Sequence, residues 1–419
     1  MPRPSVLSPP ALIVTIMLFI ACAGRHSPPT GIMVREGAWR FSLSVPGGEL
    51  PFLADLALDS SWHMTVYNGD EHIPVDEVRF SADSVRIHMP LFDSEFRGRV
   101  ENDSTIKGLW FNYLKGGDYH IPFEAHAGHA DRFPSLPSTP ASVSGTWEAH
   151  FSLGTPDAYD AIGLFQQNGE HLSGTFGTET GDYRYLDGVM SGDSLYLSCF
   201  DGSHAFLFHA RLQGDSLVGR FWSGSHWQEP WFAIRNPTFA LRDPDSLTFL
   251  REGYDMVDFR FPSIDGGTIS PKDLRFQDKV LIVQIMGSWC PNCVDETRLL
   301  TELYHEYHGR GLEVIAVAFE KHEREGEAYA ALEAFRTALD IPYTIVYAGN
   351  SGKDNAAKKL PFLDHVMSFP TAIFIDRKGM VRRIRTGFYG PGTGEHYLNY
   401  KHNLTGFVEG LLSEERPHP

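Results

Sequence analysis

Cys290 and Cys293 are separated by two residues and lie between an apolar run and a helical pattern, and no other feature of this 419-residue chain restricts its fold as much. The apolar run, residues 280–286, predicts a buried strand, and residues 294–307 predict a helix. Cys290 would be the N-cap of that helix and Pro291 its first residue, where the missing N–H leaves no hydrogen bond unmade. The sequence therefore predicts a strand, a turn and a helix that carries two thiols at its start.

The start of a helix favours negative charge on its capping residue, because its first backbone N–H groups have no partner within the helix. Such a position can lower a cysteine pKa from about 8.5 to between roughly 3.5 and 7.5, and the thiolate is the attacking species. Residues three apart share one helical face, so Cys293 can close a disulfide with Cys290 or release a mixed disulfide from it. The pair predicts thiol-disulfide redox chemistry, with no metal and no organic cofactor.

Two other interpretations of the pair remain open. His305 and His308 follow at a spacing that loosely resembles a zinc finger, so the cysteines could be half of a structural zinc site. An unbroken helix would put His305 about 18 Å from Cys293 along its axis, at about 1.5 Å per residue, which disfavours zinc. The second alternative is an inert buried pair, since thiols in apolar surroundings are unreactive.

The N-terminus predicts export from the cytoplasm. Arg3 precedes an apolar core, residues 11–21, and Cys22 follows at once, a pattern typical of a secretory signal. The four residues that end at Cys22 resemble a bacterial lipobox, with Phe19 where leucine is usual. Residues 1–22 are therefore predicted to be a lipoprotein-type signal peptide with Cys22 as the lipidated N-terminus. A signal cleaved without lipidation and an uncleaved anchor are the alternatives, and all three place the protein in the bacterial cell envelope, in the periplasm.

The remaining cysteine is predicted to be structural, and the overall charge disfavours two kinds of binding partner. Cys199 alternates with Leu195 and Leu197, which predicts a residue that packs on the buried face of a strand. The formal net charge of −17 disfavours nucleic-acid binding and adhesion to anionic lipid. Any membrane attachment is therefore expected to come from the lipid on Cys22 alone.

About 200 residues before the dithiol alternate between apolar and polar positions and are interrupted by turn residues, which predicts β-strands throughout. Two stretches, residues 31–130 and 144–236, begin alike, with Gly37-Ala38-Trp39 and Gly145-Thr146-Trp147. Further similarities follow in the same order, and they predict a tandem duplication: Asn68-Gly69 with Asn168-Gly169, Asp83-Ser84 with Asp193-Ser194, and Gly108-Leu109-Trp110 with Gly219-Arg220-Phe221-Trp222.

Each repeat is predicted to be an antiparallel barrel or sandwich, and the Gly-x-Trp starts resemble those of lipocalin-type barrels. A proline-rich stretch, residues 133–140, separates the repeats, and residues 236–245 separate the second repeat from the rest. The repeats could hold a ligand or partner, or could act as a spacer and dimerisation platform. No charged or metal-binding cluster stands out in their sequence, which favours the spacer.

Residues 250–415 alternate strands with helices and predict an α/β domain with a partly parallel sheet. The predicted strands are residues 280–286, 312–319, 344–347, 371–375 and 380–385, and the predicted helices are residues 294–307, 328–339 and 404–412. An insert occupies residues 349–365.

This domain resembles the thioredoxin superfamily and, within it, the exported TlpA/ResA-like thiol-disulfide oxidoreductases. The resemblance rests on Trp289 directly before the Cys-x-x-Cys pair, on residues 261–267 upstream, and on Ser368-Phe369-Pro370-Thr371 before the penultimate strand. It implies a cis Pro370, which places the backbone of Phe369 beside the dithiol to receive an extended substrate segment. A trans turn proline is the alternative.

The resemblance also implies that Glu296, three residues after the second cysteine, tunes the thiols, although the helix dipole alone would favour an acid there. Two positions depart from the family pattern. Arg298 replaces a common proline and brings a charge near the site, and Phe369 is bulkier than the usual residue before the cis-proline, which leaves substrate preference open.

The mechanism expected from these residues begins with attack of the Cys290 thiolate on a substrate disulfide, and Cys293 then releases the reduced substrate. The family resemblance implies a disulfide-containing protein substrate and a membrane electron donor of the DsbD or CcdA type. A thiol peroxidase is one alternative, but Gly287 stands where peroxiredoxins have threonine. A lipid-anchored binding protein whose β repeats carry the function is another. The sequence does not identify the substrate, the direction of electron flow or the oligomeric state.

Overall fold

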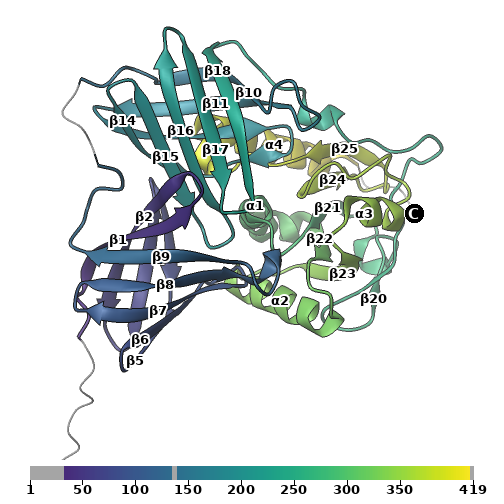
Figure 1. The fold of residues 1–419 in the computed structure, drawn as a ribbon. Helices are drawn as coiled ribbons and strands as arrows, with labels where there is room; N and C mark the ends of the chain where they lie inside the picture. The colour runs from purple at the N-terminus through teal and green to yellow at the C-terminus, as the bar shows by residue number, and fades with distance from the viewer. Residues whose placement is uncertain (1–32, 135–138, 416–419) are drawn as a thin grey trace, which may run out of the picture.

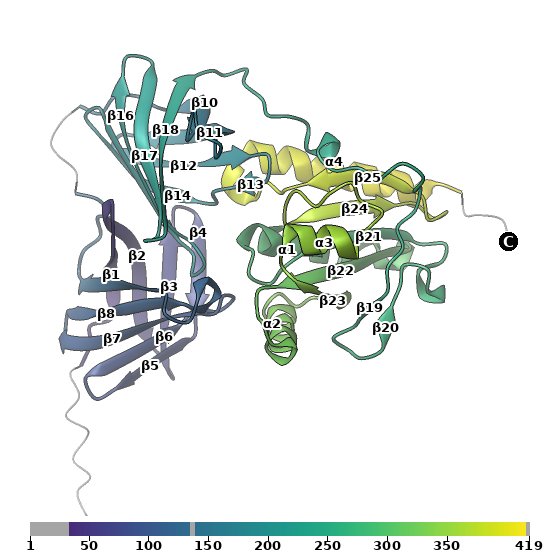
Figure 2. The ribbon, with the colours of Figure 1, turned by 45° about the vertical axis from the view of Figure 1, so that its right-hand side comes forward.

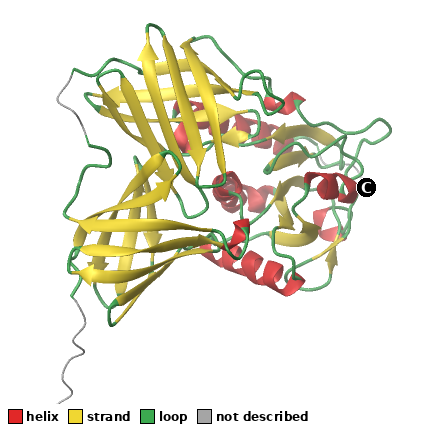
Figure 3. Cartoon of the chain, in the orientation of Figure 1, coloured by secondary structure: helices red, strands yellow, loops and turns green. Residues whose placement is uncertain are grey.

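The computed structural model describes residues 33–134 and 139–415 (Figure 1). Cys22 and the predicted signal peptide lie outside these residues. The described chain forms a first barrel (β1 to β9), a second barrel (β10 to β18) and a C-terminal domain. Every α-helix of the described residues belongs to the C-terminal domain (Figure 3). Within the same residues, no helix has both the length and the apolar character needed to cross a membrane.

The first barrel is an antiparallel meander whose edges do not quite meet. Its strands are Gly37–Val45 (β1), Gly48–Leu58 (β2), Trp62–Asn68 (β3), Glu71–Val75 (β4), Glu77–Ser81 (β5), Ser84–His88 (β6), Ser94–Asn102 (β7), Thr105–Asn112 (β8) and His120–Ala127 (β9). They are ordered β4-β3-β2-β1-β9-β8-β7-β6-β5. The predicted alternation is confirmed, because Trp39, Phe41 and Leu43 of β1 all face the core and are fully buried.

The second barrel is closed. Its strands are Gly145–Phe151 (β10), Tyr159–Asn168 (β11), His171–Thr178 (β12), Gly181–Asp182 (β13), Leu186–Ser191 (β14), Ser194–Phe200 (β15), Ala205–Gln213 (β16), Ser216–Ser223 (β17) and Trp227–Arg235 (β18). They are ordered β11-β10-β18-β17-β16-β15-β14-β12-β13, and pairing of β11 with β12 closes the ring. Two successive antiparallel barrels agree with the predicted fold class.

The predicted duplication is visible in matching details of the two barrels. The indole N–H of Trp39 donates to the carbonyl of Arg35 at 2.9 Å, and that of Trp147 donates to the carbonyl of Val143 at 2.8 Å. Each bond spans four residues and fixes the Gly-x-Trp start of its barrel. The two barrels do not match strand for strand, since three strands precede the Asn-Gly turn of the first barrel and two precede the corresponding turn of the second.

The two barrels share a core. The hairpin between β15 and β16 enters the first barrel, where the ring of Phe200 stacks on Phe52 with centroids 4.4 Å apart and meets Trp110 edge-on at 5.2 Å. The side chain of Asn68 exchanges two hydrogen bonds with the backbone of Phe200, at 2.9 and 3.1 Å. The guanidinium of Arg132 is buried between the barrels and pairs with Asp187 at 2.9 Å. The barrels therefore form one packed unit.

The C-terminal domain contains a five-stranded sheet within the described residues, ordered β23-β22-β21-β24-β25. Its elements are the strands Phe261–Pro262 (β19), Thr268–Ile269 (β20), Val280–Met286 (β21), Leu312–Glu320 (β22), Thr344–Asn350 (β23), Thr371–Ile375 (β24) and Val381–Thr386 (β25), and the helices Pro291–Tyr307 (α1), Glu325–Ala338 (α2), Lys353–Lys359 (α3) and Glu395–Ser413 (α4). Strands β21, β22 and β23 are parallel, and β24 runs antiparallel to β21. The predicted strands and the partly parallel sheet are confirmed.

Two predictions about helices in this domain need correction. Helix α4 begins at Glu395, nine residues before the predicted start, because its first half is polar and buries Tyr400 alone. The predicted insert, residues 349–365, contains helix α3, a short helix with Ala356 as its buried residue. Both segments lack the apolar periodicity on which the prediction depended.

Both barrels lie along one side of the C-terminal domain (Figure 2). Phe92, in the connection between β6 and β7, is buried in the core of the C-terminal domain together with Leu299 and Leu332. The start of α1 faces the second barrel, whose contacts with it are described below. The dithiol segment is therefore built at the junction of all three parts.

Candidate active site

The two candidate cysteines stand at the start of α1, directly after the central strand β21. Cys290 is the N-cap of α1 and Pro291 is its first residue, as the sequence predicted. The sulfur of Cys290 accepts a hydrogen bond from the backbone N–H of Cys293 at 3.3 Å. Cys290 is 6% exposed and Cys293 is fully buried, so Cys290 is the sulfur that an external disulfide can reach.

The cis-proline loop lies against the first sulfur. The Phe369–Pro370 peptide bond is cis, which confirms what the family resemblance implied. The carbonyl oxygen of Phe369 lies 3.5 Å from the sulfur of Cys290. The indole N–H of Trp289 donates to the carbonyl of Phe319 at 2.8 Å, and its ring meets the ring of Phe369 edge-on, with centroids 5.6 Å apart. Trp289, Cys290, Phe369 and Pro370 are thus gathered in one place.

Glu296 lies behind the second sulfur, inside the protein. One carboxylate oxygen accepts from the side-chain amide of Gln284 at 2.9 Å, and the other has no hydrogen-bond partner among the described residues. Burial raises the pKa of Glu296 to about 7. Burial also raises the pKa of the Cys293 thiol well above its ordinary value, and the hydrogen bond to Cys290 and the charge of Glu296 raise it further. Glu296 is therefore electrostatically coupled to the buried thiol.

A second buried carboxyl group near the dithiol was missed by the sequence analysis. Glu320, at the end of β22, accepts hydrogen bonds from the backbone N–H and the hydroxyl of Ser288, both at 2.8 Å. Burial raises the pKa of Glu320 to about 7. The sequence signal that could have identified Glu320 was an acidic residue at the carboxyl end of a buried parallel strand. Functional groups of parallel sheets are commonly found at the carboxyl ends of the strands.

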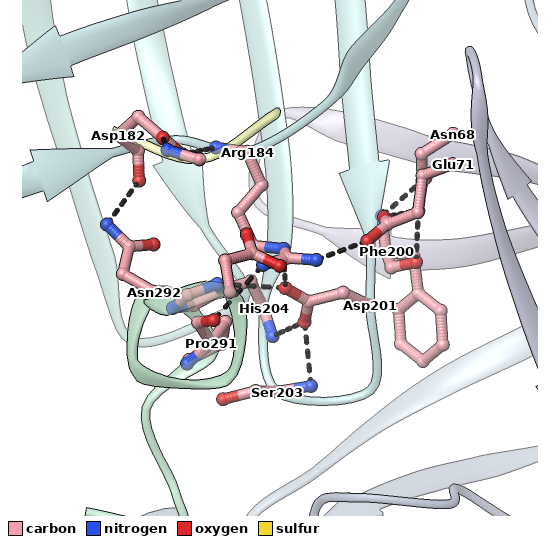
Figure 4. Close-up of polar contacts among 12 residues, drawn as sticks. Asn68, Glu71, Asp182, Arg184, Phe200, Asp201, Ser203, His204, Pro291 and Asn292 are labelled. Carbon is pink, nitrogen blue, oxygen red and sulfur yellow. Dashed lines mark hydrogen bonds and ion pairs between the residues drawn. The ribbon is translucent and has the colours of Figure 1, made fainter. Parts of the chain in front are cut away.

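A buried charge cluster ties the start of α1 to both barrels (Figure 4). Arg184, between β13 and β14, donates to the carboxylates of Asp295 on α1 and Glu71 on β4. It also donates to the carbonyl of Pro291 at 3.1 Å and lies 3.4 Å from the carboxylate of Asp201. One guanidinium therefore holds together the first barrel, the second barrel and the helix that carries the cysteines.

Burial and opposite charge have opposing effects on the pKa values in this cluster. Burial alone would lower the pKa of Arg184, but the carboxylates of Asp295, Glu71 and Asp201 raise it, so the arginine stays charged. Burial opposes ionisation of Asp201 as well, yet the charges of His204 and Arg184 lower its pKa to about 2. No charged cluster stands out in the sequence of the β repeats, but the fold builds one. Its members are single charges far apart in the sequence, and only tertiary structure brings them together.

The second barrel also touches the residues between the two cysteines. The side-chain amide of Asn292 donates to the carbonyl of Asp182 at 3.3 Å, and the hydroxyl of Ser368 donates to the carbonyl of Thr180 at 2.7 Å. At Gly181, with φ of 141°, a Cβ atom would lie 2.0 Å from the amide nitrogen of Asn292. The turn between β12 and β13 therefore contacts both the dithiol segment and the cis-proline loop.

A cavity of about 870 Å³ opens in front of Cys290, between the C-terminal domain and the second barrel. Trp289, Cys290 and Phe369 form its wall on the C-terminal side, and Tyr183 and Phe206 contribute aromatic rings from the barrel. Lys115 reaches it from the first barrel. Any molecule that reaches the sulfur of Cys290 through this cavity therefore contacts the β domains as well.

Comparison with known proteins agrees with this geometry. The profile of the AhpC/TSA family matches residues 253–384. The thiol-disulfide oxidoreductase ResA of Bacillus subtilis (strain 168) is 25% identical over 168 residues, which cover 40% of this chain and 83% of ResA. The thioredoxin-like protein YneN of the same organism is 26% identical over 138 residues, which cover 33% of this chain and 73% of YneN. The C-terminal domain is similar to the TlpA/ResA-like proteins of the thioredoxin superfamily.

A solved structure of a secreted thiol-disulfide isomerase from Corynebacterium glutamicum is similar over 42% of this chain and 99% of that chain, with 19% identity and a TM-score of 0.32. The ResA-type relatives are named thiol-disulfide oxidoreductases.

The alternatives to a ResA-type dithiol find little support in the structure. Helix α1 is continuous to Tyr307, so His305 lies three turns beyond Cys293. At Gly287 a Cβ atom would lie 2.2 Å from the indole nitrogen of Trp289 and 2.7 Å from the carbonyl oxygen of Phe319, which leaves no room for the threonine of peroxiredoxins. Cys199 is fully buried in the core of the second barrel, as predicted.

Arg298 and Phe369, which depart from the family pattern, both lie near the dithiol segment. Arg298 pairs with Asp295 at 3.3 Å, so a half-exposed charge at the surface contacts the buried cluster. The bulky ring of Phe369 fills the space between Trp289 and Phe319, with centroids 5.6 and 5.9 Å away. Phe369 thus forms an aromatic wall of the cavity beside Cys290.

Proposed function

We propose that this protein is an exported reductase of disulfides that works through Cys290 and Cys293. The observation that carries the proposal is the position of the Cys290 sulfur. It caps a helix, accepts the N–H of Cys293 at 3.3 Å, and lies 3.5 Å from the carbonyl oxygen before a cis-proline, in the wall of an open cavity. A helix N-terminus stabilises a thiolate at this position, and the thiolate is the attacking form.

In the first step, the thiolate of Cys290 attacks one sulfur of the substrate disulfide. A bond forms between Cys290 and that sulfur, the substrate disulfide breaks, and the other substrate sulfur leaves as a thiolate that takes up a proton. In the second step, Cys293 attacks the sulfur of Cys290 and releases the second substrate thiol. The protein is left with a Cys290–Cys293 disulfide, and two electrons have passed to the substrate.

Glu296 is the proposed proton acceptor for the second step. Cys293 must lose its proton before it attacks, and burial together with neighbouring negative charge raises the pKa of its thiol. A buried carboxyl group whose pKa is raised to about 7 can take that proton near neutral pH. Phe369 and Pro370 position the substrate, since the carbonyl of Phe369 can accept a backbone hydrogen bond from an extended segment.

The direction of electron flow is proposed from the charges around the second sulfur. Strong oxidants such as DsbA stabilise their reduced form, with its thiolate. Here burial, together with the neighbouring charge of Glu296, acts against a thiolate on Cys293, which favours the reducing direction. Regeneration then requires a donor, and a membrane protein of the DsbD or CcdA type suits an exported reductase.

The proposal also includes the export and the lipid anchor that the sequence predicts. Residues 1–22 are the lipoprotein-type signal, Cys22 carries the lipid, and the protein works in the bacterial periplasm close to its membrane-bound donor. The barrels correspond to residues 31–130 and 144–236, and the redox domain to residues 250–415. Cys22→Ser, expressed in the native host, should lose lipid labelling and leave the membrane fraction, whereas an equally membrane-bound variant would contradict the anchor.

The experiment that tests the mechanism is the trapping of mixed disulfides. Cys293→Ser should accumulate a covalent complex with a substrate disulfide, because Cys290 can attack but nothing can release the product. Cys290→Ser should form none, and Cys199→Ser, which alters the buried third thiol, should behave like the wild type. Equal trapping by the Cys290→Ser and Cys293→Ser variants would contradict the assigned roles.

A further inference from the structure

Two lysines line the cavity in front of Cys290 without an ion pair among the described residues, although the charges of Asp201 and Glu320 act on Lys115 and Lys321 from a longer distance. The ammonium of Lys321, which follows β22, lies over the ring of Trp289 at 4.2 Å from its centroid. Lys115, in the 3-10 turn Tyr113–Lys115 after β8, contacts the imidazole of His226 at 3.2 Å. Among the described residues, neither lysine has an aspartate or glutamate within ion-pair distance.

Of the four carboxylates that line the same cavity, two pair with a basic side chain and two accept hydrogen bonds from neutral donors. Asp160 pairs with His150 at 2.7 Å, and Glu179 pairs with Arg242. Asp182 accepts from the backbone N–H of Arg184 at 2.7 Å, and Glu229 accepts from Ser152 and Tyr159 at 2.6 and 2.9 Å. Lys115 and Lys321 therefore remain available to a ligand in the cavity, in a chain whose formal net charge is −17.

The geometry around His226 keeps one of these cations in place. Since the ammonium of Lys115 can only donate, the Nε2 atom of His226 must accept, and the Nδ1 atom then faces the hydroxyl of Tyr119 at 3.1 Å. Burial, with the charge of Lys115, lowers the pKa of His226 to about 4, so the imidazole stays neutral and acts as an acceptor. Lys115 keeps two N–H groups for a ligand.

The two lysines line one cavity with Cys290, and their charges act on each other. Burial lowers the pKa of Lys115 to about 8, and the charge of Lys321 lowers it further. Burial lowers the pKa of Lys321, while the charge of a Cys290 thiolate opposes that shift. A substrate anion in the cavity would relieve the repulsion between the two cations, whereas a cationic substrate would increase it.

We propose that this cavity selects disulfides that carry a carboxylate close to the reacting sulfur, with Lys115 and Lys321 as the residues that bind the carboxylate. The inference rests on the proposed function and adds its substrate class. A cavity of about 870 Å³ is the size of a small-ligand site, so it admits a disulfide with its immediate neighbours rather than a folded domain. The carboxylate can belong to a small-molecule disulfide or to an acidic residue beside a substrate cysteine.

The test compares three small disulfides as substrates of the reduced full-length protein: 3,3′-dithiodipropionate, which is anionic, 2-hydroxyethyl disulfide, which is neutral, and cystamine, which is cationic. The second-order rate constant of each is measured at low salt for the wild type, Lys115→Gln and Lys321→Gln. Lys107→Gln is the matched control, because Lys107 lies on β8 of the same barrel and pairs with Glu124 outside the cavity.

The wild type should prefer the anionic over the neutral disulfide, and each cavity variant should lower that preference about threefold, as expected for a partly exposed ion pair. The neutral disulfide serves as the reference, since any effect of Lys321 on the reactivity of Cys290 itself affects both probes. The control should keep the wild-type preference, and added salt should weaken it. An unchanged preference in both cavity variants, or a wild-type preference for cystamine, would overturn the inference.

A second pair of probes separates the two sources of the carboxylate. Two disulfide-linked peptides differ only by aspartate or asparagine beside the cysteine. If the lysine variants reduce only dithiodipropionate more slowly, the carboxylate belongs to a small-molecule disulfide. If they also reduce the aspartate peptide more slowly, the carboxylate belongs to an acidic protein segment. Both results support the inference. If the wild type reduces none of the probes, the proposed function itself fails, a result distinct from reduction without charge preference.

Discussion

Replacement of Glu296 by glutamine tests whether burial raises the pKa of the carboxyl group behind the second sulfur. The buried carboxyl group has a pKa of about 7, against an ordinary value of 4.5. Below pH 4.5 the group is protonated in both the folded and the unfolded chain, so the stability linked to it is fully present. As the pH rises to 7, the unfolded chain ionises first, and that stability is progressively lost.

The size of the effect follows from the difference between the two pKa values. At about 1.36 kcal/mol per pKa unit, the wild type should lose about 3 kcal/mol of stability from this group as the pH rises from below 4.5 to above 7. Glutamine cannot ionise, so Glu296→Gln should lack this loss. An unsatisfied amide in the variant would shift its stability by a constant amount and leave the pH dependence unchanged.

The measurement is the urea unfolding of the reduced protein across this pH range, followed by helical circular dichroism. This signal reports the C-terminal domain, since all α-helices of the described residues belong to it. Glu302→Gln is the control, because Glu302 lies on the same helix but is exposed and pairs with Lys401. Parallel pH profiles for the wild type and Glu296→Gln would refute the reasoning. The pKa of the Cys293 thiol should also fall in Glu296→Gln.

Two further predictions concern the junction between the barrels and the dithiol. Arg184→Met leaves the carboxylates of Glu71, Asp201 and Asp295 buried without their shared cation. The variant should be about 3–5 kcal/mol less stable than the wild type in urea unfolding. A smaller loss of stability than that of Arg211→Met, which removes an exposed arginine, would contradict this account. Gly181→Ala should displace the β12–β13 turn from Asn292 and lower kcat/KM for disulfide reduction. Gly117→Ala is the control and should leave kcat/KM unchanged, because a Cβ atom there meets nothing within 4 Å. Equal activities of the two variants would show that the turn does not position the site.

The sequence predicted those parts of the structure whose signals are local. Cys290 and Pro291 have side chains suited to the first turn of a helix, so the N-cap could be placed from five residues. The alternation of Trp39, Phe41 and Leu43 was sufficient for a barrel strand, because one face of such a strand is buried. The cis Pro370 followed from the family resemblance, since most X-Pro bonds are trans and spacing alone would not have indicated it.

The features that were missed depend on contacts between distant segments. Arg184 and Glu71 are 113 residues apart, and each resembles an ordinary exposed charge in a polar stretch until the fold buries them together. Phe200 follows the pattern of a strand in its own barrel, and nothing in its neighbourhood shows that it enters the other barrel. The cavity and its lysines likewise arise from three parts of the chain that meet only in the folded protein.

The reduction potential of the Cys290–Cys293 couple is the most direct test of the central claim. The full chain with Cys199→Ser, which removes the third described thiol, is equilibrated in thiol/disulfide buffers, and its oxidation state is measured by alkylation and mass spectrometry. The account predicts a potential near that of thioredoxin, about −270 mV. A value near about −120 mV, as in DsbA, would identify a disulfide donor, and the absence of any reversible disulfide would contradict a redox role for the two cysteines.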